Sequence, residues 1–164
     1  MLSNLKLINS SLTVLLFLSS IAFANGNVLN KTLSLKASKE QVWSALTSEN
    51  ELSKWWNDGV KLEPVVGGDF YEPWGDDQLA TGKVKRVITN KLIEFTWQEK
   101  YWDQSQITTC LFTIKAQGDH SILEVQHSGW NTFKDIEEKE KMIIGFEKGW
   151  DAVLLRLKDY IEDN

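Results

Sequence analysis

Side chains able to do acid–base, nucleophilic or metal chemistry are scarce in this 164-residue sequence. It contains two histidines, His120 and His127, and one cysteine, Cys110. A zinc site needs about four converging ligands, mostly histidine and cysteine, and this supply is too small for one. The Gly67-Gly68 pair lacks the lysine and the helix that follow in a nucleotide-binding loop, so it indicates a hairpin turn. The sequence therefore predicts no metal and no cofactor.

His127 is the ionisable residue of most interest. It follows Leu123 and Val125 at two-residue spacing, which in a strand places all three on one apolar face. Burial there favours the neutral imidazole. His127 can then be a general base, the polar anchor of a ligand, or a structural histidine satisfied by a neighbouring carbonyl or hydroxyl group. A general base needs a second positioned group, and the strand acids Glu94 and Glu124 are predicted to point to the opposite, solvated faces.

Aromatic side chains are unusually abundant, with eight tryptophans and seven phenylalanines. Each can bury roughly 150–250 Å², and ligand sites are mostly apolar with few polar anchors. These residues can therefore line a cavity as well as fill a core, whereas Cys110 is predicted to be an inert core residue. The candidate ligand-binding residues are Trp56, Phe70, Phe95, Trp97, Phe112, His127, Trp130 and Trp150.

Hydrophobic periodicity indicates the elements that position these residues. Residues 28–35 alternate as a half-buried strand, and two short helices follow, one after the N-cap Ser38 and one over 49–56. The segments that come next leave no room for crossover helices, so their sheet should be antiparallel. Alternation fails within 84–88, where we expect a β-bulge. The predicted strands cover 61–65, 69–74, 80–88, 91–99, 106–116 and 121–128.

The last part of the chain, over 137–161, has helical periodicity instead. At the α-helical rise this segment measures roughly 38 Å, enough to cross a small sheet. Gly145 and Gly149 share one face of this helix, and each costs about 1 kcal/mol relative to alanine. We therefore expect either sheet backbone or a ligand to come close to that face. The apolar stripe consists of Ile143, Phe146, Trp150, Val153 and Leu157, with Tyr160 or Ile161.

Residues 1–24 are typical of a secretory signal peptide. Lys6 precedes an apolar run over 12–18, which ends in the small-residue pattern Ala22-Phe23-Ala24. Cleavage after Ala24 would leave residues 25–164 as one exported domain, periplasmic or secreted, with no stable membrane insertion. Loss of Lys6 changes the formal net charge from -5 to -6, and such an acidic domain is not expected to bind nucleic acid.

Several short motifs occur along the chain in a particular order. They are the Ser-Lys-Glu-Gln-Val-Trp-Ser-Ala-Leu-Thr run over 38–47, Trp55-Trp56, Gly67-Gly68-Asp69-Phe70, Gly82-Lys83-Val84, the Leu-Ile-Glu-Phe-Thr-Trp run over 92–97, His127-Ser128-Gly129-Trp130 and Gly149-Trp150. Together they resemble the START-like (SRPBCC) superfamily, in the branch of heat-shock protein 90 ATPase activator homologues. The resemblance implies an α+β helix-grip fold, in which a curved antiparallel sheet of about seven strands wraps around a long C-terminal helix. Two short helices follow the first strand, and an apolar cavity often lies between sheet and helix.

Three classes of function remain open. We favour a carrier or sensor that binds a small apolar ligand between the sheet and the C-terminal helix. An enzyme of cyclase or hydrolase type would use His127 in acid–base work. A protein-binding module, related to the heat-shock protein 90 ATPase activators, would need exposed aromatic residues, for which Trp74 and Trp102 are the best candidates. An exported chain would not meet that cytosolic partner.

Overall fold

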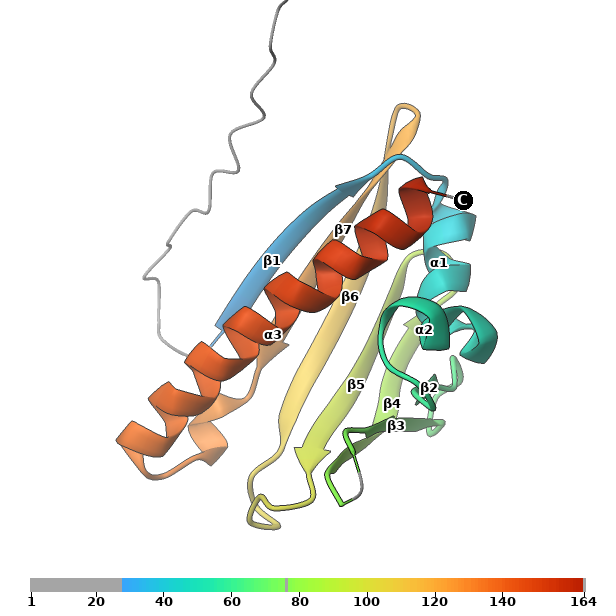
Figure 1. Ribbon diagram of the computed structural model, residues 1–164. Coiled ribbons are helices and arrows are strands. Elements are labelled where there is room, and N and C mark those ends of the chain that lie inside the picture. Colours follow the sequence, from blue (N-terminus) through green and yellow to red (C-terminus); the bar gives the residue numbers. More distant parts are fainter. Residues whose placement is uncertain (1–27, 76, 164) are drawn as a thin grey trace, which may run out of the picture.

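The computed structural model describes residues 28–75 and 77–163, which form an α+β fold (Figure 1). The predicted signal peptide, residues 1–24, lies outside this part of the chain. One antiparallel sheet of seven strands has the order β1-β7-β6-β5-β4-β3-β2. The strands are β1 Val28–Leu35, β2 Lys61–Leu62, β3 Asp69–Pro73, β4 Leu79–Ile88, β5 Leu92–Glu99, β6 Thr108–Gln117 and β7 His120–Ser128.

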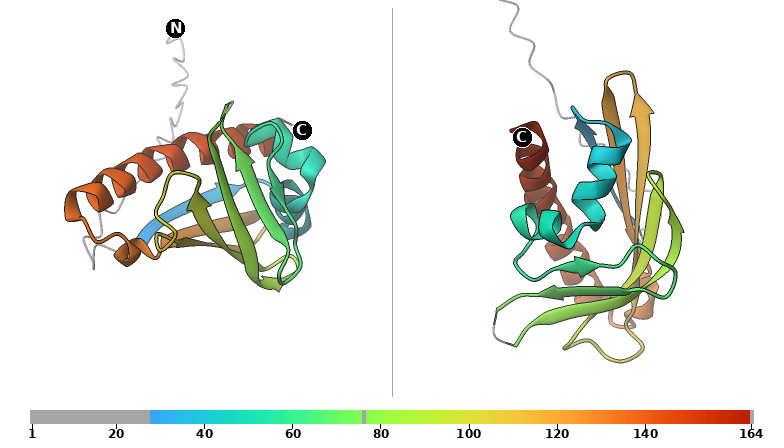
Figure 2. Two further views of the ribbon diagram at one scale, coloured as in Figure 1. Left: turned by 90° about the horizontal axis from the view of Figure 1, so that it is seen from below. Right: turned by 90° about the vertical axis from the view of Figure 1, so that its right-hand side faces the viewer.

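Three α-helices cover one face of this sheet (Figure 2). They are α1 Lys39–Thr47, α2 Glu49–Trp55 and the long α3 Ile136–Glu162, which follows a short 3-10 turn, η1 Trp130–Thr132. The predicted helix-grip architecture is confirmed. None of the helices in the described part of the chain has the length and apolar character needed to cross a bilayer.

Strand alternation positions the core as predicted. The inward residues Phe95 of β5, Phe112 of β6 and Val125 of β7 are almost completely buried. The expected β-bulge is present as a register shift between Val84 and Arg86, where β4 pairs with β5. Only β2 is much shorter than predicted, because the chain over 63–68 closes into turns held by its own backbone amides.

The first helix begins at a capping box. The Ser38 hydroxyl accepts a hydrogen bond from the Gln41 amide at 3.2 Å, and the Gln41 side chain accepts one from the Ser38 amide at 2.9 Å. These two bonds satisfy amides that a helix N-terminus otherwise leaves unpaired. They fix the direction in which α1 leaves β1.

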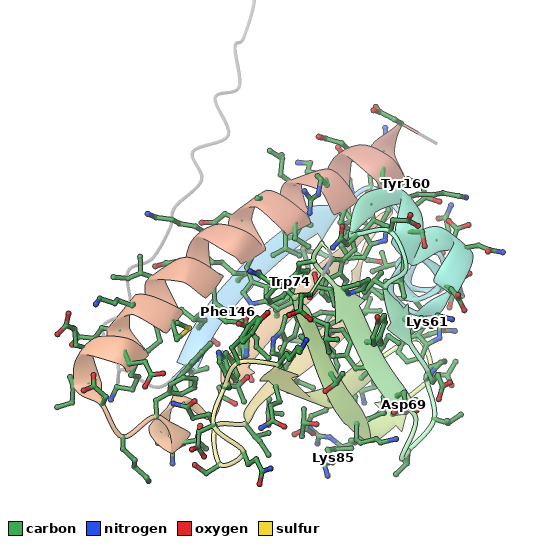
Figure 3. The ribbon with its side chains drawn as sticks, turned by 60° about the horizontal axis from the view of Figure 1, so that its bottom comes forward. Lys61, Asp69, Trp74, Lys85, Phe146 and Tyr160 are labelled. Atoms are coloured by element: carbon green, nitrogen blue, oxygen red, sulfur yellow. The ribbon has the colours of Figure 1, made fainter. Side chains whose placement is uncertain are left out.

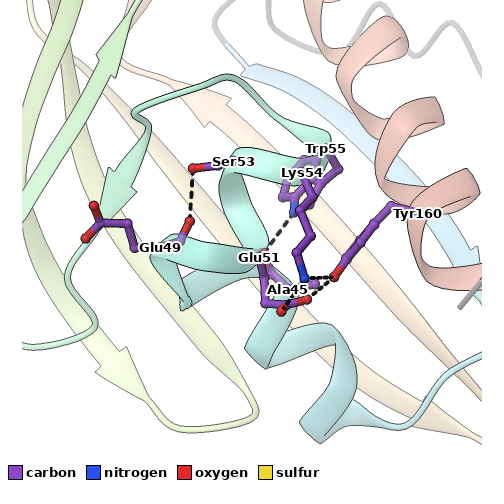
Figure 4. A network of polar contacts seen from close by, with 7 residues as sticks. All are labelled: Ala45, Glu49, Glu51, Ser53, Lys54, Trp55 and Tyr160. Atoms are coloured by element: carbon purple, nitrogen blue, oxygen red, sulfur yellow. Dashed lines mark hydrogen bonds and ion pairs between the residues drawn. The ribbon is translucent and has the colours of Figure 1, made fainter.

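Polar contacts hold α3 from both sides. On the β1 side, Lys31 forms an ion pair with Asp151 at 2.7 Å. On the other side, the Tyr160 hydroxyl contacts the carboxylate of Glu51 and lies 3.4 Å from the Lys54 ammonium, both in α2 (Figure 4). The Arg156 guanidinium adds hydrogen bonds to the carbonyl oxygens that end α2. The helix is therefore fixed over the sheet by both neighbours.

Candidate functional site

A cavity of about 370 Å³ lies between α3 and the β3–β5 half of the sheet. Figure 3 shows two of its lining residues, Trp74 and Phe146, in the space between α3 and the strands. The sheet and the end of α2 contribute Trp56, Glu72, Trp74, Trp97 and Glu99, and α3 contributes Lys141, Met142, Gly145, Phe146, Gly149, Trp150 and Val153. Most of the lining is apolar, with two carboxyl groups and one ammonium group.

The aromatic residues of the lining contact one another. Trp56 stacks on Trp97 with ring centroids 6.3 Å apart, and it meets the edge of Trp150 at 5.7 Å. Trp97 also contacts Trp74 at 6.2 Å and Phe146 at 5.5 Å. These contacts join α2, the sheet and α3 around the cavity, so its shape depends on all three.

The two glycines of α3 face open space. A Cβ atom built on Gly145 or Gly149 would meet no atom within 4 Å beyond its chain neighbours and the nearby helix backbone, and both residues line the cavity. Of the two expectations for this helix face, close sheet backbone is therefore excluded. The missing side chains leave room that α3 would otherwise fill.

The predicted ligand-binding residues divide into two groups. Trp56, Trp97 and Trp150 line the cavity. The other five lie in the packed core next to it, each at most 1% exposed: Phe70, Phe95, Phe112, His127 and Trp130. The core group supports the lining, since Phe70 packs against Trp97 with ring centroids 4.7 Å apart.

His127 is held by hydrogen bonds to both of its ring nitrogens. The Trp150 indole donates to Nδ1 of His127 at 3.2 Å, so this nitrogen is the acceptor and the proton resides on Nε2. Nε2 donates to the Thr108 hydroxyl at 2.8 Å, and that hydroxyl donates to the Trp97 carbonyl at 3.2 Å. Burial lowers the pKa of His127 to about 3. Both ring nitrogens are occupied, as expected for a structural histidine.

Cys110 is also buried, and burial raises the pKa of its thiol well above the ordinary value. The thiolate is the nucleophilic form of cysteine, and it is disfavoured here. Among the described residues, no group of three or more His, Cys, Asp or Glu side chains is arranged to hold a metal ion.

Sequence reasoning missed two acidic residues of the cavity, Glu72 and Glu99. Glu94 and Glu124 do face outward, where they pair with Arg86 at 2.9 Å and with Lys115 at 2.6 Å. They are not the only strand acids, however. Two-residue spacing from buried Phe70 places Glu72 on the inner face of β3, and the same spacing from buried Trp97 places Glu99 on the inner face of β5. That signal was available in the sequence.

Glu72 is 5% exposed. Its Oε1 accepts a hydrogen bond from the Trp56 indole at 2.6 Å, and the neighbouring Trp74 side chain also acts to lower the pKa of Glu72. Oε2 is buried and has no hydrogen-bond partner among the described residues. Burial raises the pKa of Glu72 to about 7, and burial also raises the pKa of Glu99 to about 7.

The two tryptophans proposed as exposed contact residues are turned inward. Trp74 lines the cavity. Trp102 packs against Phe133 and Phe146, with ring centroids 4.9 Å and 5.9 Å apart. Both are therefore half-buried against other aromatic rings rather than fully exposed.

The helix-grip fold, with a long C-terminal helix across one antiparallel sheet, is that of a START-like protein. Within that class, the chain belongs to the family of activator of Hsp90 ATPase homolog 1-like proteins, which matches residues 36–162. The resemblance predicted from the sequence is confirmed. No protein with a curated description matches the chain significantly.

Several solved structures share this fold. One protein from Mesorhizobium loti superposes with a TM-score of 0.70 at 20% identity, over 84% of this chain and 98% of its own. The Aha1 dimer from Colwellia psychrerythraea superposes with a TM-score of 0.68 at 25% identity, over 82% of this chain and 96% of its own. CalU16 from Micromonospora echinospora superposes with a TM-score of 0.61 at 22% identity, over 82% of this chain and 75% of its own. At such identities the likeness is one of fold.

Proposed function

We propose that this protein binds a small, mainly apolar ligand in the cavity between the sheet and α3. The observation that carries the proposal is the open, tryptophan-lined space beneath Gly145 and Gly149. Each glycine costs the helix about 1 kcal/mol relative to alanine, although a methyl group would fit at both positions. A fold built for stability alone gains nothing from these glycines, whereas a binding site gains volume.

The two other classes of function have less support. Acid–base catalysis by His127 needs a free ring nitrogen, and both nitrogens are engaged in hydrogen bonds. A protein-binding module needs exposed aromatic side chains, and Trp74 and Trp102 are half-buried against other aromatic rings. Proteins of this family and fold bind ligands or proteins, and the cavity favours the ligand.

Native mass spectrometry of the purified protein tests the proposal by searching for a co-purified ligand. A thermal-shift screen of lipids and aromatic metabolites follows, because a compound that binds only the folded state raises the unfolding temperature. We expect Gly149→Leu, which fills the cavity, to abolish the shift. Ile144→Ala is the matched control, since Ile144 lies on the same helix, is 53% exposed and does not line the cavity.

Three results would count against a carrier. They are the absence of any bound mass, the absence of a shift with every compound, and a shift that survives in Gly149→Leu. A shift retained in Ile144→Ala but lost in Gly149→Leu supports binding beneath α3.

A further inference from the structure

The geometry points to the charge of this ligand. We propose that the cavity takes an organic cation, an amine or quaternary ammonium group on an apolar body, with Glu72 and Glu99 as its counter-ions. The inference rests on the proposed function and adds a ligand class to it. It depends on the carboxyl groups, their register and the aromatic rings around them.

The unpartnered oxygen of Glu72 is the first observation. The side chain is 95% buried, since its exposed fraction is 5%, and it lines the cavity. One oxygen is satisfied by the Trp56 indole at 2.6 Å, and Oε2 has no partner in the described part of the chain. Buried polar atoms are almost always hydrogen-bonded. Glu72 therefore places a buried carboxyl group, one oxygen of which has no partner, in the wall of the cavity.

A second carboxyl group lies on the same inner face. Glu72 of β3 pairs with Ala80 of β4, and Ala80 in turn pairs with Glu99 of β5. The two acids are thus separated by one strand, and both line the cavity. The charge of Glu99 opposes ionisation of Glu72, as like charges do. A cation bound near both would relieve this repulsion and favour the two carboxylates.

Aromatic faces complete the environment that a cation requires. Trp56, Trp74 and Trp97 all line the cavity, and tryptophan is the aromatic residue that attracts cations most strongly through its ring face. The indole N–H of Trp97 is buried and has no hydrogen-bond partner among the described residues.

The protein's own cations do not neutralise these acids. Lys141 lines the cavity from α3, but its Nζ lies 2.8 Å from Glu137 and its side chain is 69% exposed. Arg156 lowers the pKa of Glu72 only as the weakest contribution. Its guanidinium donates to the carbonyl oxygens of Trp55 and Trp56 at 3.0 Å and 3.1 Å. No ion pair to Glu72 or Glu99 is formed within the described residues, so their charge is available to a ligand.

The test compares benzyltrimethylammonium with neopentylbenzene, in which carbon replaces the charged nitrogen and the shape is kept. Binding to the full chain is followed by calorimetry and tryptophan fluorescence. At pH 8 we expect the cation to bind at least about tenfold more tightly than the neutral probe. At pH 5 this preference should shrink, because protonation removes the two negative charges.

Variants separate charge recognition from the cavity itself. Glu72→Gln should reduce the preference for the cation about tenfold while leaving the affinity for neopentylbenzene unchanged. Glu99→Gln, at a partly exposed position, should act in the same direction. Lys141→Met should strengthen cation binding, because it removes a like charge from the lining.

Each outcome decides between the two proposals. Equal affinity for both probes, unchanged in Glu72→Gln and Glu99→Gln, overturns the cation and leaves the apolar cavity standing. Failure of both probes to bind overturns the cation and the cavity together. Loss of both probes in Gly149→Leu, with loss of the cation alone in Glu72→Gln, supports both.

Discussion

At the scale of single residues, His127 shows how a polar group can be stable in an aromatic core. Its two nitrogens are matched by one donor, the Trp150 indole, and one acceptor, the Thr108 hydroxyl. The sequence placed His127 on the inner face by simple alternation. It did not identify these partners, because they come from α3 and β6, which are distant in sequence, and their contact depends on tertiary packing.

His127 should make the fold sensitive to acid. Its folded pKa of about 3 lies below the ordinary value of 6.5, so between these values the unfolded chain binds a proton that the native state refuses. Stability contributed by His127 is therefore present above pH 6.5 and is lost as the pH falls towards 3, by at most about 1.4 kcal/mol per pH unit. Urea unfolding at pH 7 and pH 5 should show a smaller decrease for His127→Asn than for wild type. Equal decreases would contradict the neutral buried imidazole.

Glu72 should have the opposite effect on pH dependence. Its folded pKa of about 7 lies above the ordinary value of 4.5, so the native state holds a proton that the unfolded chain has released. The stability that this bound proton contributes is present below pH 4.5 and is lost as the pH rises through 7. We therefore compare the free energies of unfolding of Glu72→Gln and wild type at two pH values. Between pH 5 and pH 8, this difference should change in favour of Glu72→Gln by on the order of 2 kcal/mol. Urea unfolding measures this gain. Glu94→Gln, on the outer face, is the control, and a gain of the same size there would contradict the assignment to Glu72.

At the scale of elements, α3 combines a stabilising stripe with a destabilising pair of glycines. We expect Gly149→Ala to raise the free energy of unfolding by about 1 kcal/mol, because the new Cβ meets nothing within 4 Å. Chemical denaturation measures the change. Gly82→Ala in β4 provides the contrast, since its Cβ would lie 1.7 Å from the Thr96 carbonyl oxygen, and it should be strongly destabilising. A loss of stability in Gly149→Ala would mean that the face beneath α3 is not open.

Periodicity predicted the elements better than the site they form. The predicted range 137–161 differs by one residue at each end from the observed α3, Ile136–Glu162. The β-bulge in β4 was also predicted at the correct position. Periodicity could not separate Trp97, which lines the cavity, from Phe95, which fills the core, because both lie on the inner face of β5. Such a distinction depends on the distance between α3 and the sheet, which alternation along one strand does not encode.

At the scale of the whole molecule, the two halves of the sheet are covered differently. On the β1 side, α3 packs against β1, and Lys31 forms an ion pair with Asp151. On the β3–β5 side, the glycine-bearing face of the same helix stands over the tryptophan cavity. The gripping helix therefore packs against β1 along one edge and forms the roof of the cavity along the other. The family resemblance implied such a cavity, but the sequence did not show on which side it would lie.

The position of the first described strand bears on the proposed export of the chain. The first described strand begins at Val28, so cleavage after Ala24 would leave a short lead of three residues, 25–27, before β1 and would remove no described element. We therefore expect the chain starting at Asn25 to have the same urea midpoint as the full-length protein. Intact-mass measurement of periplasmic or secreted material should give the mass of residues 25–164. Blocking the cleavage pattern with Ala24→Trp should instead leave the longer precursor. A mature N-terminus at Met1, or recovery of wild type in the cytosol alone, would overturn export, whereas a lower midpoint for the shortened chain would show that the leader contributes to the fold.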